Sequence, residues 1–237
     1  MLKFITRFFI LILITGISGV IFLTYFGLET NKFDNLIKSK SSEFDQNIRL
    51  DFVKTKIHLN PSELNLVIKL KNPQVLIKNN AIDLSKLDLF LSIKSFFTSD
   101  FLLKRAEVAF IKNDIKDLTK ITNIFIPRII NKQLTKIFSK GTLQGEFFIP
   151  FETDGKIAKD YWFEGKISKA FIKLNKEIGI KNLTAEINHG KGVKDNGFSI
   201  AVEEGSFFDL KLNDTIINLI RNKKATKIES KLHTNGK

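Results

Sequence analysis

The stretch Leu64-Asn-Leu-Val-Ile-Lys-Leu70 decides the fold of this chain, because apolar side chains occupy every second position in it. Successive side chains of an extended strand point to opposite faces, so this spacing predicts a β-strand with one apolar face. The same alternation returns over Leu87–Ile93 and over Ala106–Ile111. The side chains that share the predicted apolar face are Leu64, Leu66, Ile68, Leu70, Leu87, Leu89, Leu91, Ile93, Val108 and Phe110.

Turn signals separate these strands, at Asn60-Pro61, Asn72-Pro73 and Asn79-Asn80. Short strands with turns at a spacing of roughly ten residues predict an antiparallel meander. The pattern resumes after Gly141, and Phe163 and Ile167 continue the apolar face there. The strands that we expect in this second part are Thr142–Phe151, Tyr161–Leu174, Ile178–Ile187, Phe198–Val202, Ser206–Leu212 and Thr226–Leu232.

Three stretches have helical spacing instead. The spacing predicts one helix over Glu29–Gln46, directly after the apolar segment at the start of the chain, and a short helix over Asp214–Arg221. Asp114–Lys140 carries an apolar stripe with lysines elsewhere, and Pro127 predicts a kink within it. A basic amphipathic helix of this kind either packs on the sheet or lies on a membrane surface.

The predicted strands greatly outnumber the helices that could cover them. The sheet therefore either closes on itself as a sandwich or barrel, or stays open with an exposed apolar trough. An open trough exceeds the apolar patch that a soluble monomer tolerates, so lipid would have to fill it. Periodicity leaves both alternatives open.

The start of the chain predicts a membrane anchor. Phe8–Leu28 contains 21 residues without a charged side chain, and at ~1.5 Å per residue such a helix spans about the hydrocarbon core of a bilayer. The run is longer than the core of a signal peptide and ends without an Ala-x-Ala pattern. We therefore expect an uncleaved single-pass anchor, with the amino terminus in the cytoplasm and the body outside.

Composition and motifs argue against several functions. The net charge is +13, but the 38 lysines and arginines are dispersed without a dense basic run, so we expect no nucleic-acid partner. Cysteine is absent and the three histidines, His58, His189 and His233, are far apart. No nucleophile–base pair or phosphate-binding loop is present in the sequence. We expect neither an enzyme nor a cofactor or metal site.

The rhythm of strands and turns resembles the N-terminal region of the AsmA-like family of periplasmic β-groove proteins. The stretches that carry this resemblance are Leu70–Ile77, Ile82–Ile93, Phe96–Val108, Asp114–Leu118, Gly141–Gly145, Asp154–Ile157 and Phe163–Ala170. It implies an N-terminal transmembrane helix followed by a curved, open antiparallel sheet with one or two amphipathic helices. It also implies a single-pass inner-membrane protein of a Gram-negative bacterium, with its body in the periplasm.

The function that this resemblance implies is the binding or conduction of phospholipid along the apolar groove, in support of the outer membrane. Membrane phospholipid and envelope proteins would be its partners. A structural envelope protein with a closed β core and no lipid is the alternative. The expected parts are an anchor (1–28), a helical stalk (29–47), a first sheet section (48–113), a helical insertion (114–140) and a second sheet section (141–237), which we expect to be incomplete at its C-terminal end.

Overall fold

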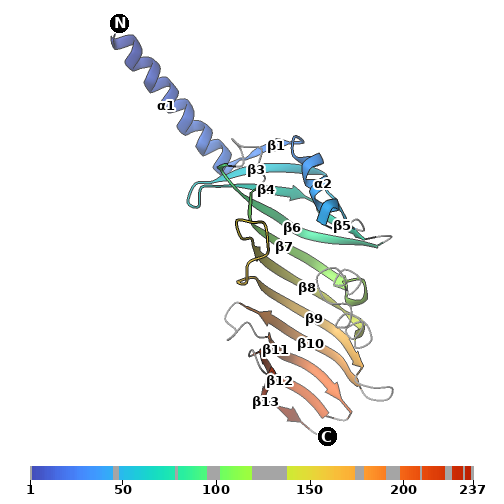
Figure 1. Ribbon diagram of the computed structural model, residues 1–237. Helices are drawn as coiled ribbons and strands as arrows, with labels where there is room; N and C mark the ends of the chain where they lie inside the picture. Colours follow the sequence, from blue (N-terminus) through green and yellow to red (C-terminus); the bar gives the residue numbers. More distant parts are fainter. Residues whose placement is uncertain are drawn as a thin grey trace.

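The computed structural model describes residues 2–44, 48–77, 80–94, 102–118, 138–173, 179–190, 198–208, 210–221, 226–231 and 233–235. An N-terminal helix projects from one end of a long twisted sheet (Figure 1). The helices are α1 (Leu2–Tyr25) and α2 (Asp34–Phe44). The strands up to the middle of the chain are β1 (Leu28–Thr30), β2 (Ile48–Asp51), β3 (Lys54–Asn60), β4 (Asn65–Lys71), β5 (Gln74–Ile77), β6 (Asn80–Ser92) and β7 (Leu103–Asp114). The later strands are β8 (Phe138–Pro150), β9 (Trp162–Lys173), β10 (Gly179–His189), β11 (Phe198–Phe207), β12 (Leu210–Arg221), β13 (Thr226–Lys231) and β14 (Thr234–Asn235).

All fourteen strands belong to one sheet, ordered β1-β3-β4-β6-β7-β8-β9-β10-β11-β12-β13 along its main path. β2 and β5 pair beside β6, and β14 pairs with β12. Its pairings are antiparallel. β1 and β13 are the two ends of this path, and among the described strands they do not pair with each other. The sheet is therefore open, which confirms the predicted class of a mainly β protein with an N-terminal apolar helix and few other helices.

Helix α1 is long and apolar enough to cross a bilayer. Over Lys3–Tyr25 it contains a window with a mean hydropathy of 2.3, none of which is buried. The amides of Phe26 and Gly27 both donate to the carbonyl of Phe22, and Gly27 has a φ of 70°. A left-handed glycine of this kind ends a helix. The helix thus stops at Tyr25, and Leu28, which the sequence placed in the anchor, begins β1.

The first hairpin is bent around α2. β2 pairs with β5 and β3 pairs with β4, so the two arms change direction together at Phe52-Val53 and Asn72-Pro73. Asn72 has a φ of 51° at this bend, and the amide of Val53 donates to the carbonyl of Lys71. α2 packs against β2 on the inner side of the bend (Figure 1). The bend therefore brings a helix onto one face of an otherwise open sheet.

Residues with a positive φ recur in the strands of the second half of the sheet. Gly141 in β8, Lys169 in β9, Asn182 in β10 and Asp214 in β12 all have positive φ, between 47° and 119°. The pairing register shifts next to Gly141 and Asn182. Such bulges bend a strand and increase its twist. Such residues occur in β8, β9, β10 and β12, in the twisted second half of the sheet (Figure 1).

Several predicted element boundaries differ from the structure. Of the helix expected over 114–140, the structure describes a helical turn at 115–118 and strand β8 from Phe138, while 119–137 lies outside the described residues. The first residues of 29–47 belong to β1, and α2 begins at Asp34. Strand β11 continues to Phe207 through residues 203–205, where a break was predicted.

The short helix predicted over Asp214–Arg221 is wrong, because those residues belong to β12. Both of its neighbours, β11 and β13, pair along this stretch. The isoleucines Ile216, Ile217 and Ile220 favour a pleated strand over a helix. Their spacing fits a helix for two turns only, and the ladder of two neighbouring strands outweighs it.

Candidate functional site: the apolar face of the sheet

Cross-strand pairing defines two faces of the sheet. Ile68 lies opposite Leu89, Leu89 opposite Ala106, and Val108 opposite Phe147. Phe147 lies opposite Phe163, and Leu143 lies opposite Ile167. Partners in an antiparallel ladder point to the same face. We call this the apolar face and the opposite one the polar face; on β10 to β12 the apolar face continues through Ala185, Ile187, Ile200, Val202 and Ile217.

The structure brings most of the predicted site residues together on this face. Nine of them belong to one hydrophobic cluster or pack against it: Leu66, Ile68, Leu70, Leu87, Leu89, Leu91, Val108, Phe110 and Phe163. Ile167 belongs to a second cluster with Ala170, Leu183, Ala185 and Val202. Two predicted residues lie elsewhere. Leu64 is 63% exposed in the β3–β4 turn, and Ile93 follows the end of β6.

The clusters differ in what covers them. Phe33 and Ile37 lie within or against the first cluster, so α2 covers the apolar face near α1. Ile115 belongs to the second cluster, and Leu118, from the same helical turn, packs against the first. On the described part of β8 to β12, Ile167, Leu183 and Val202 are buried in the second cluster, whereas Phe147, Ile187 and Ile200 on the same face remain partly exposed.

Three phenylalanines meet in the middle of the apolar face. The ring of Phe163 lies 4.5 Å from Phe147 and 6.3 Å from Phe110, centroid to centroid. Gly145 and Gly165 are cross-strand partners, and a Cβ on either would collide with the ring of Phe163. The glycines therefore allow this ring to lie flat on the sheet. Sequence reasoning missed Phe147 and both glycines, although Phe147 alternates correctly with Ile149 and Gly145.

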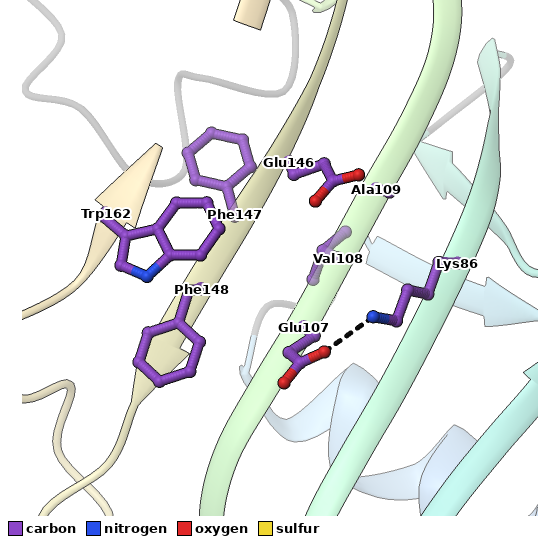
Figure 2. Close-up of a pocket in the computed structure, with 8 residues that line it drawn as sticks. All are labelled: Lys86, Glu107, Val108, Ala109, Glu146, Phe147, Phe148 and Trp162. Atoms are coloured by element: carbon purple, nitrogen blue, oxygen red, sulfur yellow. Dashed lines mark hydrogen bonds and ion pairs between the residues drawn. The ribbon is translucent and has the colours of Figure 1, made fainter. Parts of the chain in front are cut away.

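The polar face carries paired charges and a hollow. The hollow has a volume of about 330 Å³, and the side chains around it include Lys86, Glu107, Glu146, Phe148 and Trp162 (Figure 2). Lys86 Nζ lies 2.6 Å from Glu107 Oε2. The rings of Phe148 and Trp162 stack at 5.6 Å. Lys86 pairs with Glu107 across the strands and Glu146 adds a further negative charge, and this cross-strand pairing fits a register lock better than a reaction site.

A row of aromatic rings and one guanidinium crosses four strands on the same face. Arg105 lies 3.7 Å above the ring centroid of Phe90 and 5.7 Å from that of Phe148, which stacks on Trp162. Arg105 also binds Glu107 and Glu63. Cation–π and stacking contacts of this kind favour one strand register over its alternatives.

Burial shifts the pKa values of one aspartate and one histidine on the polar face. Burial raises the pKa of Asp88, against the pull of Lys69 and Lys86. Burial also lowers the pKa of His58, whose ring is hydrogen-bonded to the Thr24 backbone at the end of α1. Neither group lies beside a candidate nucleophile, and within the described ranges no cluster of His, Cys, Asp and Glu could hold a metal. His189, whose ring contacts Tyr161, lies on β10, whereas His58 lies on β3, so the two histidines do not form one site.

The apolar face is thus the candidate site of this fold: it starts at the end of α1 and extends across the sheet. Comparison of the chain with protein-family models, curated proteins and solved structures finds no match. The resemblance to the AsmA-like family therefore rests on the sequence rhythm, and the function of the apolar face is argued from its own chemistry.

Proposed function

We propose that this protein is anchored in a membrane by α1 and binds the acyl chains of phospholipids along the apolar face of its open sheet. The expected setting is the inner membrane of a Gram-negative bacterium, with the sheet in the periplasm and lipid held or conducted toward the outer membrane. The observation that carries the proposal is the continuity of the apolar face from the strands beside α1 to β12.

The geometry supports an extended apolar ligand. Phe147, Ile187 and Ile200 come from successive parts of the sheet and remain partly exposed. Exposed apolar surface of this extent costs free energy in water, at ~25 cal/mol per Å² of apolar area. An acyl chain laid across the strands would recover that free energy without specific polar contacts. The gain depends little on which methylene meets which side chain, so a chain could slide with small barriers.

The end of the apolar face next to α1 is the natural place for lipid to enter. β1 and β3 lie directly beside the end of α1, with Leu28 opposite Ile57. α2 covers this part of the face through Phe33 and Ile37. Lipid leaving the bilayer at Tyr25 would therefore meet an apolar surface that is already sheltered on one side.

The test is photo-crosslinking of the full chain in membranes that contain phospholipid with a diazirine in its acyl chain. We expect crosslinks on the apolar face of β8 to β12, and co-purifying phospholipid in mild detergent. The double variant Ile187→Asp with Ile200→Asp should lose at least about tenfold in crosslinking, because two carboxylates make the site costly for an acyl chain.

The matched control is Ile216→Asp. Ile216, on the neighbouring strand β12, lies opposite Ala201 on the polar face and is 42% exposed, so it places the same kind of substitution on the other side of the sheet. The control variant should retain both crosslinking and lipid. Equal crosslinking in the two variants, or no lipid with the folded wild-type chain, would contradict the proposal and favour a scaffolding protein without lipid.

A further inference from the structure

Four lysines face one another on the polar face at the α1 end of the sheet. Lys54 lies opposite Lys71 and Lys56 opposite Lys69, all on the hairpin of β3 and β4. We call these four residues the lysine patch. Like charges directly opposite each other in a ladder repel and destabilise it. A sequence retains such pairs at a cost, so a ligand that supplies negative charge is the simplest reason for them.

Neighbouring acids compensate this charge only in part. Glu29, opposite Lys56, forms an ion pair with Lys54 at 2.9 Å in which both side chains are more than half exposed. The hydrogen bond from Lys54 lowers the pKa of Glu29, and Lys71 and Lys56 add to the effect. Lys56, Lys69 and Lys71 make no ion pair in the described part of the chain. The patch therefore keeps a net positive charge.

Cations elsewhere on the sheet are treated differently. Lys86 lies against Glu107, Lys166 binds both oxygens of Glu203, and Arg105 binds Glu63. Each of these cations forms a direct ion pair with a carboxylate from another element. In the lysine patch only Lys54 forms such a pair. Asp88 lies opposite Lys69 on β6, so two acids, Glu29 and Asp88, stand beside four lysines.

The lysine patch lies beside the end of α1. Leu28 pairs with Ile57, which places Lys56 next to the first residues after the helix. A Cβ on Gly27 would lie 2.7 Å from the His58 ring and 2.8 Å from the Ile57 carbonyl oxygen, so the chain is held tightly against β3 there. If Tyr25 ends the membrane span, the hairpin starts within the headgroup region, which is several Å thick on each side of the bilayer. Lysine side chains extend far enough to reach it.

We propose that the lysine patch binds the anionic headgroups of the bilayer that holds α1. Phosphate-bearing lipid would neutralise the cross-strand repulsion and keep β1, β3 and β4 close to the membrane surface. Juxtamembrane lysines are attracted to anionic lipid in this way. The inference rests on the membrane anchoring in the proposed function, but it does not require lipid on the apolar face.

The chain contains no cysteine, so one engineered cysteine gives a site-specific probe. Ser62, exposed in the β3–β4 turn, is replaced by Cys and labelled with a fluorophore. The full chain is reconstituted in phosphatidylcholine vesicles, with or without about 30 mol% phosphatidylglycerol, and a headgroup nitroxide lipid serves as quencher. We expect quenching to rise at least about twofold with the anionic lipid and to fall again at high salt, because the attraction is electrostatic.

Changing all four patch lysines to Gln should abolish the dependence on anionic lipid, and changing them to Arg should retain it. The matched control changes four exposed lysines on later strands and a loop, Lys159, Lys173, Lys181 and Lys211, to Gln, and should behave as the wild type. The fluorescence of Trp162, the single tryptophan, reports whether each variant is folded.

Three results would overturn the inference: quenching independent of anionic lipid, equal loss in the control variant, or patch-dependent binding of a soluble polyanion with no effect of lipid charge. Vesicle flotation separates this failure from failure of the proposed function. A chain that does not float with vesicles lacks the anchor itself. A chain that floats and crosslinks acyl chains on β8 to β12, but ignores lipid charge, retains the proposed function without the lysine patch as a lipid site.

Discussion

The apolar face has two sections that share one sequence pattern and differ in burial. In the section under α2, large side chains are almost fully buried: Ile68 is 1% exposed and Ile82 is 2% exposed. In the section from β8 to β12 burial is mixed: Ile167 and Leu183 are each 4% exposed and lie beside the fully buried Ala170 and Ala185, but other large side chains stay partly exposed. Alternation determines which face a side chain joins, but a covering element determines whether a large side chain leaves water. The section under α2 is therefore a core, whereas in the second section Phe147, Ile187 and Ile200 remain partly exposed within the described residues.

The largest expected effect compares one isoleucine from each section. Ile68→Ala should destabilise the full chain by about 3 kcal/mol, since it leaves a cavity beneath α2. Ile187→Ala, in the second section, should cost about 1 kcal/mol, since its side chain is only partly buried. Chemical unfolding in detergent, followed by Trp162 fluorescence, measures both values. Equal losses would mean that the second section is as fully packed as the first.

The next prediction concerns how closely β8 and β9 approach each other in the second section. Gly141 has a φ of 119°, and a Cβ there would lie 2.6 Å from the Cα of Ala170. Gly141→Ala should therefore cost about 2 kcal/mol, from backbone strain together with a collision with backbone. Gly155 also has positive φ but faces open space, so Gly155→Ala is the control and should cost about 1 kcal/mol. The same unfolding measurement applies, and a smaller loss at Gly141 than at Gly155 would contradict the close approach.

The attachment of α2 gives a third prediction. Thr55, fully buried in β3, donates a hydrogen bond of 2.5 Å to the carboxylate of Asp34 in the first turn of α2. Asp34→Ala should cost about 1–2 kcal/mol, because it removes this bond and leaves the Thr55 hydroxyl buried without its acceptor. Hydrogen exchange should speed up in α2 and β3 but not in β10 and β11. Uniform acceleration along the chain would show that α2 does not act as a separate cover.

Residue patterns account for the class of the fold and for most of the candidate face. Leu66, Ile68 and Leu89 were correctly assigned to one apolar face because a strand with a period of two leaves few alternatives. Leu64 was misplaced for a local reason. It continues the alternation in sequence, but its φ of 50° places it in the turn before β4.

What periodicity could not reveal is how the sheet bends and what covers it. Positive φ at Lys169 has no sequence signal, because lysine rarely adopts this conformation and no glycine or asparagine marks it. Helix α2 covers Ile68 because the hairpin bends at Asn72-Pro73. In the sequence, Asn-Pro at this position predicts only an ordinary turn. The choice between a closed and an open sheet depended on such features, and local spacing alone left it open.

The smallest effect tests burial on the polar face. Burial raises the pKa of Asp88 above its usual 3.8, although Lys69 and Lys86 favour the charged form. The folded state thus binds this proton more tightly than the unfolded state. Its contribution to stability is fully present below the unfolded pKa and is lost as the pH rises through the folded one. At neutral pH the charged carboxylate is a net cost, so Asp88→Asn should raise the free energy of unfolding by under about 1 kcal/mol.

At pH 3 Asp88 is protonated in the folded chain, so the wild type and Asp88→Asn should unfold alike there. Glu107 and His58 also face Asp88, one making its charge less favourable and the other more favourable. The difference between the two proteins should therefore grow as the pH rises above the usual pKa of the carboxyl. Unfolding curves between pH 3 and pH 7 measure it. If Asp88→Asn is instead less stable than the wild type at pH 7, the attraction of Lys69 and Lys86 for the charged carboxylate outweighs the cost of burying it.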